Sequence, residues 1–244
     1  MKDIQNLPDH RQVDIRKVGV REITYPITIL DRAKKEQRTI ARINMFVNLP
    51  HHFKGTHMSR FVEILNRHRD RVDISTFHLI LEEMKERLEA EEAHLEMEFP
   101  FFVRRGRKNR ARVELDRYIC RLHGSLAEKE KLSLEIKIPI RLPAPAPLNG
   151  LMPRSRGRWG NVTIKVRFSR FAWIEEIINL AEEAILRHND TLDPDGENSV
   201  LTVEGMAGAI GRAFTDFTAI KWFSIKARNL SEGYSTFALL DSCT

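Results

Sequence analysis

Apolar and polar positions divide the first half of the chain into two strand-like stretches followed by two helix-like ones. Within residues 11–48, VDIRKVGVREI and QRTIARINMFVNL show mixed alternation, with Pro26 and the polar run DRAKKEQ between them, which predicts two strands. From about Ser59 the spacing becomes helical. A second helix is predicted from its N-cap Ser75 to about Glu98. The apolar faces of the two helices are Phe61, Ile64 and Leu65, and then Phe77, Ile80, Leu81, Met84, Leu88 and Leu95.

The second half begins with a predicted hairpin, in which two long alternating strands within 111–140 are joined by a polar turn at 127–131. Prolines, glycines and arginines then remove all periodicity from 141–160, which marks a loop. The pattern further predicts a strand at 161–169, helices at 171–188 and 203–217, and strands at 220–230 and 234–240. This order indicates an α+β fold with antiparallel sheets and helices on one face. The predicted domains are a module at 1–140, the inter-module loop 141–160 and a module at 161–244.

Composition excludes some classes of protein. With 244 residues, of which 42% are hydrophobic, the chain is long enough for a sizeable core. No stretch approaches the roughly 20 apolar residues of a membrane span, and the N-terminus lacks the apolar region of a secretory signal, so we expect a cytoplasmic protein without a membrane partner. Cys120 and Cys243 belong to no CxxC pair and are predicted to be free thiols.

The net charge of +6 favours anions without identifying one. An arginine-rich run at 104–112 is interpreted as a solvated loop, with an anion or RNA contact as the alternative, and nucleic acid is not the expected partner because no aromatic side chains interleave with the arginines. The glutamates of the second helix are interpreted as its solvated face rather than a metal cluster. They are Glu82, Glu83, Glu86, Glu89, Glu91 and Glu92.

One segment, LPHHFKGTHMSRFVEILN at 49–66, is specific enough to indicate a family. It resembles the signature of the type IB GTP cyclohydrolases, and QRTIARINMFVNLP, EEAHLEMEFPFF, VTIKVR and FAWIEEII are similar as well. The resemblance implies tandem tunnelling-fold (T-fold) modules, a homotetramer and active sites between subunits. It also implies the conversion of GTP and water to 7,8-dihydroneopterin triphosphate and formate, a step of folate and pterin biosynthesis.

The resemblance also implies a catalytic zinc or manganese held by Cys, His and a carboxylate, which would activate water for attack on the guanine ring. The family's cysteine position is Met152, and a thioether is a poor ligand for these metals. The loop that matches the family's histidine reads GRWGN and contains none. Only Glu197, shifted by one residue after Pro194 and Asp195, is a candidate metal ligand. We therefore assign no metal site and no catalytic residue.

Three residues are candidates for substrate binding. The resemblance matches Glu204 with a carboxylate that accepts two N–H bonds from the edge of a purine or pterin; the alternative is a helix-start glutamate favoured by the helix dipole. His57 and Arg60 are candidates for a hydrogen bond and a phosphate contact, with local capping or pairing as the alternative. Tyr234 replaces the family's C-terminal histidine. His51, His52, His94 and His123 are interpreted as surface or packing residues.

The sequence leaves three hypotheses. The chain is a GTP cyclohydrolase that has rebuilt its metal site or works without metal, a non-catalytic or repurposed T-fold paralogue that binds a purine or pterin, or a basic RNA-binding or assembly protein. Loss of several ligands favours the second, because metal ligands act as a set. A local shift of reading frame within 141–160 would also explain Met152, although not Gly196 or Tyr234.

Overall fold

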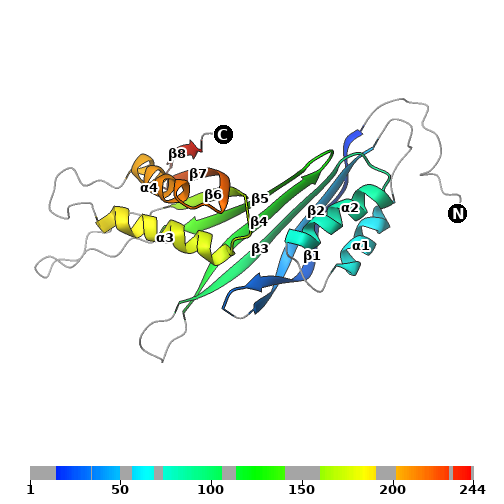
Figure 1. Ribbon diagram of the computed structural model, residues 1–244, viewed down its shortest axis with the longest axis horizontal. Coiled ribbons are helices and arrows are strands. Elements are labelled where there is room, and N and C mark those ends of the chain that lie inside the picture. Colours follow the sequence, from blue (N-terminus) through cyan, green and yellow to red (C-terminus); the bar gives the residue numbers. More distant parts are fainter. Residues whose placement is uncertain are drawn as a thin grey trace, which may run out of the picture. The chain divides into compact units, whose positions relative to one another are not determined.

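The structure of the protein is a computed structural model that describes residues 15–33, 35–49, 57–68, 74–105, 114–140, 160–190, 202–230 and 233–242. Within these ranges it contains eight strands and four helices (Figure 1). The strands are β1 (Ile15–Asp31), β2 (Lys35–Leu49), β3 (Ala93–Arg105), β4 (Glu114–Leu126), β5 (Glu130–Pro139), β6 (Asn161–Phe168), β7 (Ile220–Leu230) and β8 (Ser235–Asp241). The helices are α1 (Met58–Arg67), α2 (Ile74–Arg87), α3 (Ile174–Asp190) and α4 (Val203–Thr215).

The strands follow one another in the sheet in chain order, from β1 to β8. The paired strands β1–β2, β2–β3, β3–β4, β6–β7 and β7–β8 are antiparallel. The predicted α+β class with helices on an antiparallel sheet is therefore confirmed. Residues 1–134 and 135–244 form two compact units, divided within β5, while the predicted boundaries at 140 and 160 stay a prediction.

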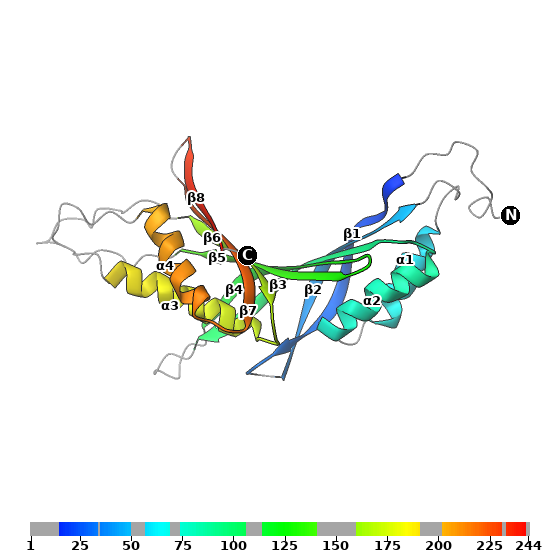
Figure 2. The same ribbon diagram turned by 45° about the horizontal axis from the view of Figure 1, so that its top comes forward.

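In the first unit, α1 and α2 lie against each other and cover one face of the strands (Figure 2). Alternate residues of β2 from Ala41 to Val47 and of β3 are buried, including Ile43, Met45, Leu95 and Met97. The predicted helical stripes are confirmed, because Phe61, Ile64 and Leu65 of α1 and Phe77, Ile80, Leu81 and Met84 of α2 are all buried. Phe77 lies directly over Gly124 of β4, so a Cβ added at Gly124 would be 2.3 Å from the Phe77 ring.

In the second unit, α3 and α4 pack together, and α4 contacts β7 and β8. Thr202 caps α4, since its Oγ1 accepts a hydrogen bond of 3.0 Å from the Gly205 N–H. Phe214 of α4 meets Phe223 of β7 edge to face, with ring centroids 5.8 Å apart. Among the described residues, no helix is long and apolar enough to cross a membrane.

The predicted end of the second helix was wrong. α2 begins at Ile74, which places the predicted cap Ser75 inside its first turn, and it ends at Arg87 rather than near Glu98. Glu89 adopts a positive φ of 51°, which ends the helical path, and β3 starts at Ala93. Leu95 lies seven residues, about two helical turns, after Leu88, so the helical spacing carried the predicted stripe past the real end of the helix.

The interruption expected around Pro26 was also wrong, because β1 continues through Pro26 to Asp31. β1 is the first strand in the sheet order and pairs with β2, where Pro26 lies opposite Ile40. A proline is tolerated at such an edge because its missing N–H removes no hydrogen bond between neighbouring strands. The irregularity lies instead at Glu22, whose φ is 61° and whose N–H donates to Asn44 Oδ1 at 2.9 Å.

Candidate functional site

The start of α1 holds two of the predicted binding residues. His57 is the N-cap, with extended backbone angles (φ −79°, ψ 103°), and its side chain makes no capping hydrogen bond to the helix. Its carbonyl accepts a hydrogen bond of 3.1 Å from the Arg60 N–H. Both side chains are partly buried. The structure therefore brings His57 and Arg60 together within one helical turn.

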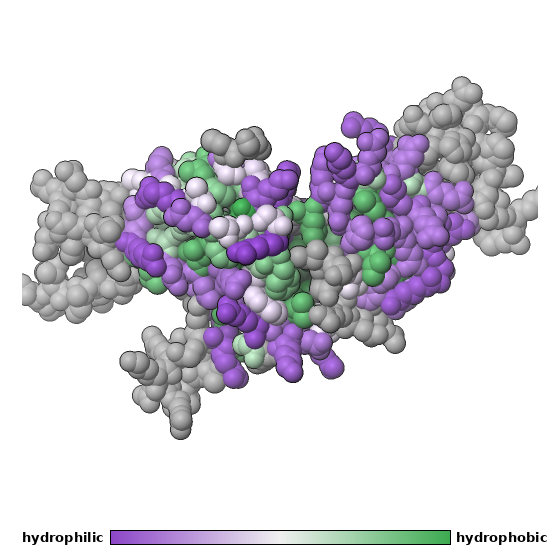
Figure 3. Space-filling view, viewed as in Figure 1, coloured by the Kyte–Doolittle hydropathy of each residue, from purple (hydrophilic) through white to green (hydrophobic). Residues whose placement is uncertain are grey.

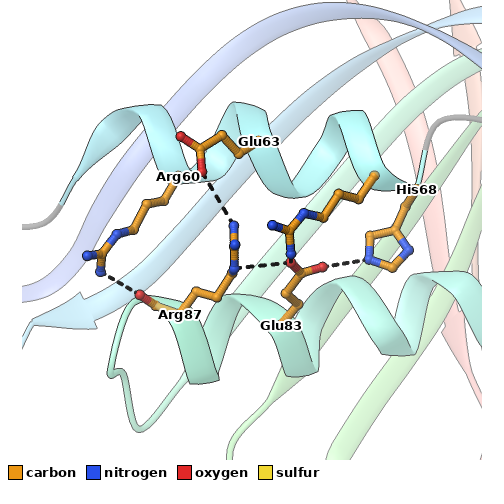
Figure 4. A network of polar contacts seen from close by, with 6 residues as sticks. Arg60, Glu63, His68, Glu83 and Arg87 are labelled. Carbon is orange, nitrogen blue, oxygen red and sulfur yellow. Dashed lines mark hydrogen bonds and ion pairs between the residues drawn. The ribbon is translucent and has the colours of Figure 1, made fainter.

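Arg60 turns toward α2. Its Nη1 donates a 2.7 Å hydrogen bond to the carbonyl of Arg87, the last residue of α2 (Figure 4). A guanidinium at this place satisfies a carbonyl that has no partner within the helix and complements the negative end of the helix dipole. Arg60 thus makes the local capping contact considered as its alternative role, whereas its contact with phosphate stays a prediction.

Glu83 is the centre of a polar network between α1 and α2. Its Oε1 lies 2.8 Å from Arg67 Nη1 and 3.3 Å from Arg87 Nε, and its Oε2 lies 2.8 Å from His68 Nε2. The side chain of Glu83 is only 17% exposed, so its assignment to a solvated face was wrong. Elsewhere over α1 and α2 the visible surface is mostly hydrophilic (Figure 3), and Glu82 and Glu86 are exposed as predicted.

Glu204 belongs to the second unit, in the first turn of α4. It is exposed, and it makes no hydrogen bond or ion pair with another described residue. The helix begins after its cap Thr202, two residues before Glu204, so the carboxylate lies at the positive end of the helix dipole. The geometry therefore suits an accepting carboxylate for a ligand as well as a dipole-stabilising one.

His188, near the end of α3, lies beside the start of α4 and was not singled out in the sequence. A Cβ added to Gly205 would be 2.7 Å from its Nε2. Burial lowers the pKa of His188 below its ordinary value, and the positive charge of Arg212 lowers this pKa further. The only sequence signal for this contact is the glycine at 205, which leaves room for the imidazole.

The histidines of β3 and β4 pair with glutamates on the face of the strands away from the core. His94 Nε2 lies 3.2 Å from Glu92, and His123 Nδ1 lies 3.7 Å from Glu96. Burial lowers the pKa of His94, while Glu92 opposes the shift. Neither histidine belongs to a group that could hold a metal, since no set of three His, Cys, Asp or Glu residues within the described ranges does so.

Several predicted features lie outside the described residues. They are Met152 and Glu197, His51 and His52, and all of the arginine-rich run except Arg104 and Arg105.

Comparison with solved structures defines the class of protein. The urate oxidase from Bacillus sp. TB-90 covers 94% of this chain with all of its own, at a TM-score of 0.59 and 7% identity. The urate oxidase from Bacillus subtilis 168 covers 93% with 98% of its own, at a TM-score of 0.58 and 9% identity. At such low identity these likenesses establish the fold alone, which is the tunnelling type.

Sequence comparison defines the family within that class. The profile of the family described as type I GTP cyclohydrolase folE2 matches residues 1–192. The GTP cyclohydrolase FolE2 of Syntrophus aciditrophicus is 39% identical over 239 residues, covering 94% of both chains. That of Geobacter sp. strain M21 is 38% identical and covers 99% of this chain and 94% of its own. The chain belongs to the type I GTP cyclohydrolase FolE2 family.

Proposed function

We propose that this chain binds GTP, or a related purine or pterin, through the carboxylate of Glu204. Family membership supports GTP as the ligand, and the observation that carries the proposal is the exposed carboxylate in the first turn of α4. A carboxylate that accepts two N–H groups from one heterocycle edge forms a charge-assisted, bidentate pair, which gives orientation as well as affinity. His57 is the second binding residue of the proposal, as a hydrogen-bonding group.

Turnover of GTP to 7,8-dihydroneopterin triphosphate and formate is proposed to be weak or absent in this chain. The loop 141–160 contains neither cysteine nor histidine, and its cysteine position is Met152. A thioether beside arginines does not suit a divalent zinc or manganese ion, and Glu197 alone would hold one weakly. The residues present therefore do not fit the family's metal, and no catalytic step is assigned to it.

The first test is to read the coding DNA over codons 141–160 and to measure metal and formate. A confirmed sequence, with no stoichiometric metal and no formate released from GTP, supports a binding protein. A corrected frame that restores cysteine and histidine, or formate release by the metal-loaded protein, refutes the proposed loss of activity. Salt-dependent RNA binding in the same preparation would instead favour the RNA-binding alternative.

The second test separates ligand binding from helix stability at α4. Glu204→Gln removes the carboxylate and should abolish thermal stabilisation by GTP and neopterin. Thr202→Ala is the matched control, because it removes the cap at a cost of about 1 kcal/mol while it keeps the carboxylate. It should lower Tm yet retain the ligand shift. Equal ligand shifts in wild type and Glu204→Gln would refute the role of Glu204.

The proposed assembly is the homotetramer implied by the family, with binding sites between subunits. Light scattering coupled to gel filtration measures the mass directly. A monomer that still binds GTP would refute sites between subunits.

A further inference from the structure

At the contact between α1 and α2, one carboxylate pairs with three basic side chains. Glu83 projects from the third turn of α2 and meets Arg67 and His68 at the far end of α1 (Figure 4). The same carboxylate holds the Nε of Arg87, whose Nη1 lies 3.4 Å from Glu63 of α1. Because these interactions are charge-assisted and partly shielded from water, they are directional and strong for a helix surface.

Arg87 extends the connection to the start of α1. Its carbonyl accepts the hydrogen bond from Arg60, one turn after His57. α1 is thus tied to α2 at both ends, through Arg67 and His68 at one and through Arg60 at the other. A ten-residue helix is unstable by itself, so its placement depends on such tertiary contacts.

We infer that Glu83 is a positioning residue that fixes the start of α1, and with it His57, and that Arg60 acts by capping α2 rather than by binding substrate phosphate. Removing the Glu83 charge would release Arg67 and His68 directly. It would also leave the Arg87 side chain tied to α1 only through Glu63. The part of this inference that concerns ligand rests on the proposed function.

Hydrogen exchange tests the positioning of α1 without any ligand. Glu83→Gln keeps the size of the side chain but removes its charge, and it should speed amide exchange in α1 about tenfold through easier local opening. Glu86→Gln is the matched control, since Glu86 is an exposed glutamate on the same helix. Glu83→Asp, which keeps the charge, should restore part of the protection. Unchanged exchange of α1 in Glu83→Gln would overturn the inference.

A comparison of GTP with guanosine tests the role of Arg60. A positioning residue affects every ligand that uses His57, so Arg60→Ala should weaken the binding of GTP and of guanosine by the same factor, on the order of tenfold for loss of one charge-assisted bond. Weakening confined to GTP would show a phosphate contact and overturn the assignment. If wild type binds neither ligand, the proposed function and the ligand half of the inference both fail, while hydrogen exchange still decides whether Glu83 holds α1.

Discussion

The two units each place a pair of helices on a set of strands, but they join the two helices by different means. Between α1 and α2 the contacts at the rim are charged, and Glu83 connects Arg67, His68 and Arg87. Between α3 and α4 the contact instead depends on a small residue, because Gly205 admits the ring of His188. Charged contacts depend on the orientation of the paired groups and weaken when salt is added. Close packing instead sets the distance between the helices and is sensitive to changes of side-chain volume.

The candidate functional residues follow the same contrast. His57 starts a short helix whose placement depends on a charged network, while Glu204 starts a helix with its own Thr202 cap and a row of buried residues. We therefore expect the first unit's candidate residue to be sensitive to distant charge changes. The second unit's candidate should be sensitive to changes of side-chain volume.

The largest expected effect comes from the packed core of the second unit. Phe214→Ala removes a fully buried ring that meets Phe223, and it should lower the free energy of unfolding by about 3–5 kcal/mol. Phe237→Ala, at a phenylalanine of β8 that is 61% exposed, is the control and should cost less than about 1 kcal/mol. Urea unfolding measures both. Similar losses would show that α4 is not anchored through this ring.

The next effect comes from the charged network of the first unit. Glu83→Gln should cost about 1–2 kcal/mol, because three basic groups lose a shared anionic partner, whereas Glu86→Gln should change stability by less than about 0.5 kcal/mol. The difference should shrink in 1 M NaCl, where the screening length falls to about 3 Å. A cost that is independent of salt would indicate lost packing rather than lost charge.

A smaller effect distinguishes two glycines of α4. Gly208→Ala should stabilise by about 0.5–1 kcal/mol, since the nearest atom to its new Cβ is 3.7 Å away and alanine favours a helix. Gly205→Ala should lose that gain and destabilise, because its Cβ would lie 2.7 Å from His188. Thermal unfolding compares the two variants. Stabilisation by both would mean that His188 moves aside without cost.

The sequence predicted the parts of this fold that depend on local periodicity. α1, α3, α4 and the β4–β5 hairpin were found because their buried residues repeat at helical or alternating spacing. Glu83 was misjudged because its partners Arg67 and His68 lie at the end of another helix, sixteen and fifteen residues away, where spacing along one helix gives no information. The end of α2 was missed because its last turn depends on the positive φ of Glu89, which no pattern signals.

The candidate site was predictable only where a local rule applies. Glu204 and Thr202 follow helix-start chemistry, so their placement could be expected, and the exposed carboxylate is visible in the structure. The capping of α2 by Arg60 depends on two helices meeting, and the contact of His188 with Gly205 does as well. Such contacts arise from tertiary packing, and the only sign of them in the sequence is at most a glycine.

The smallest expected effect is the pH dependence of the two units. Burial lowers the pKa of His188 and of His94 below the ordinary value of 6.5, so both residues stay neutral in the fold at a pH where the unfolded chain already takes up protons. The stability that these two histidines contribute is therefore complete above pH 6.5 and is lost as the pH falls through their lowered pKa values.

Wild type should lose stability between pH 7.5 and 5.5. His188→Gln and His94→Gln should each lose less over the same range in urea unfolding. An equal loss in all three proteins would assign the acid sensitivity to other groups.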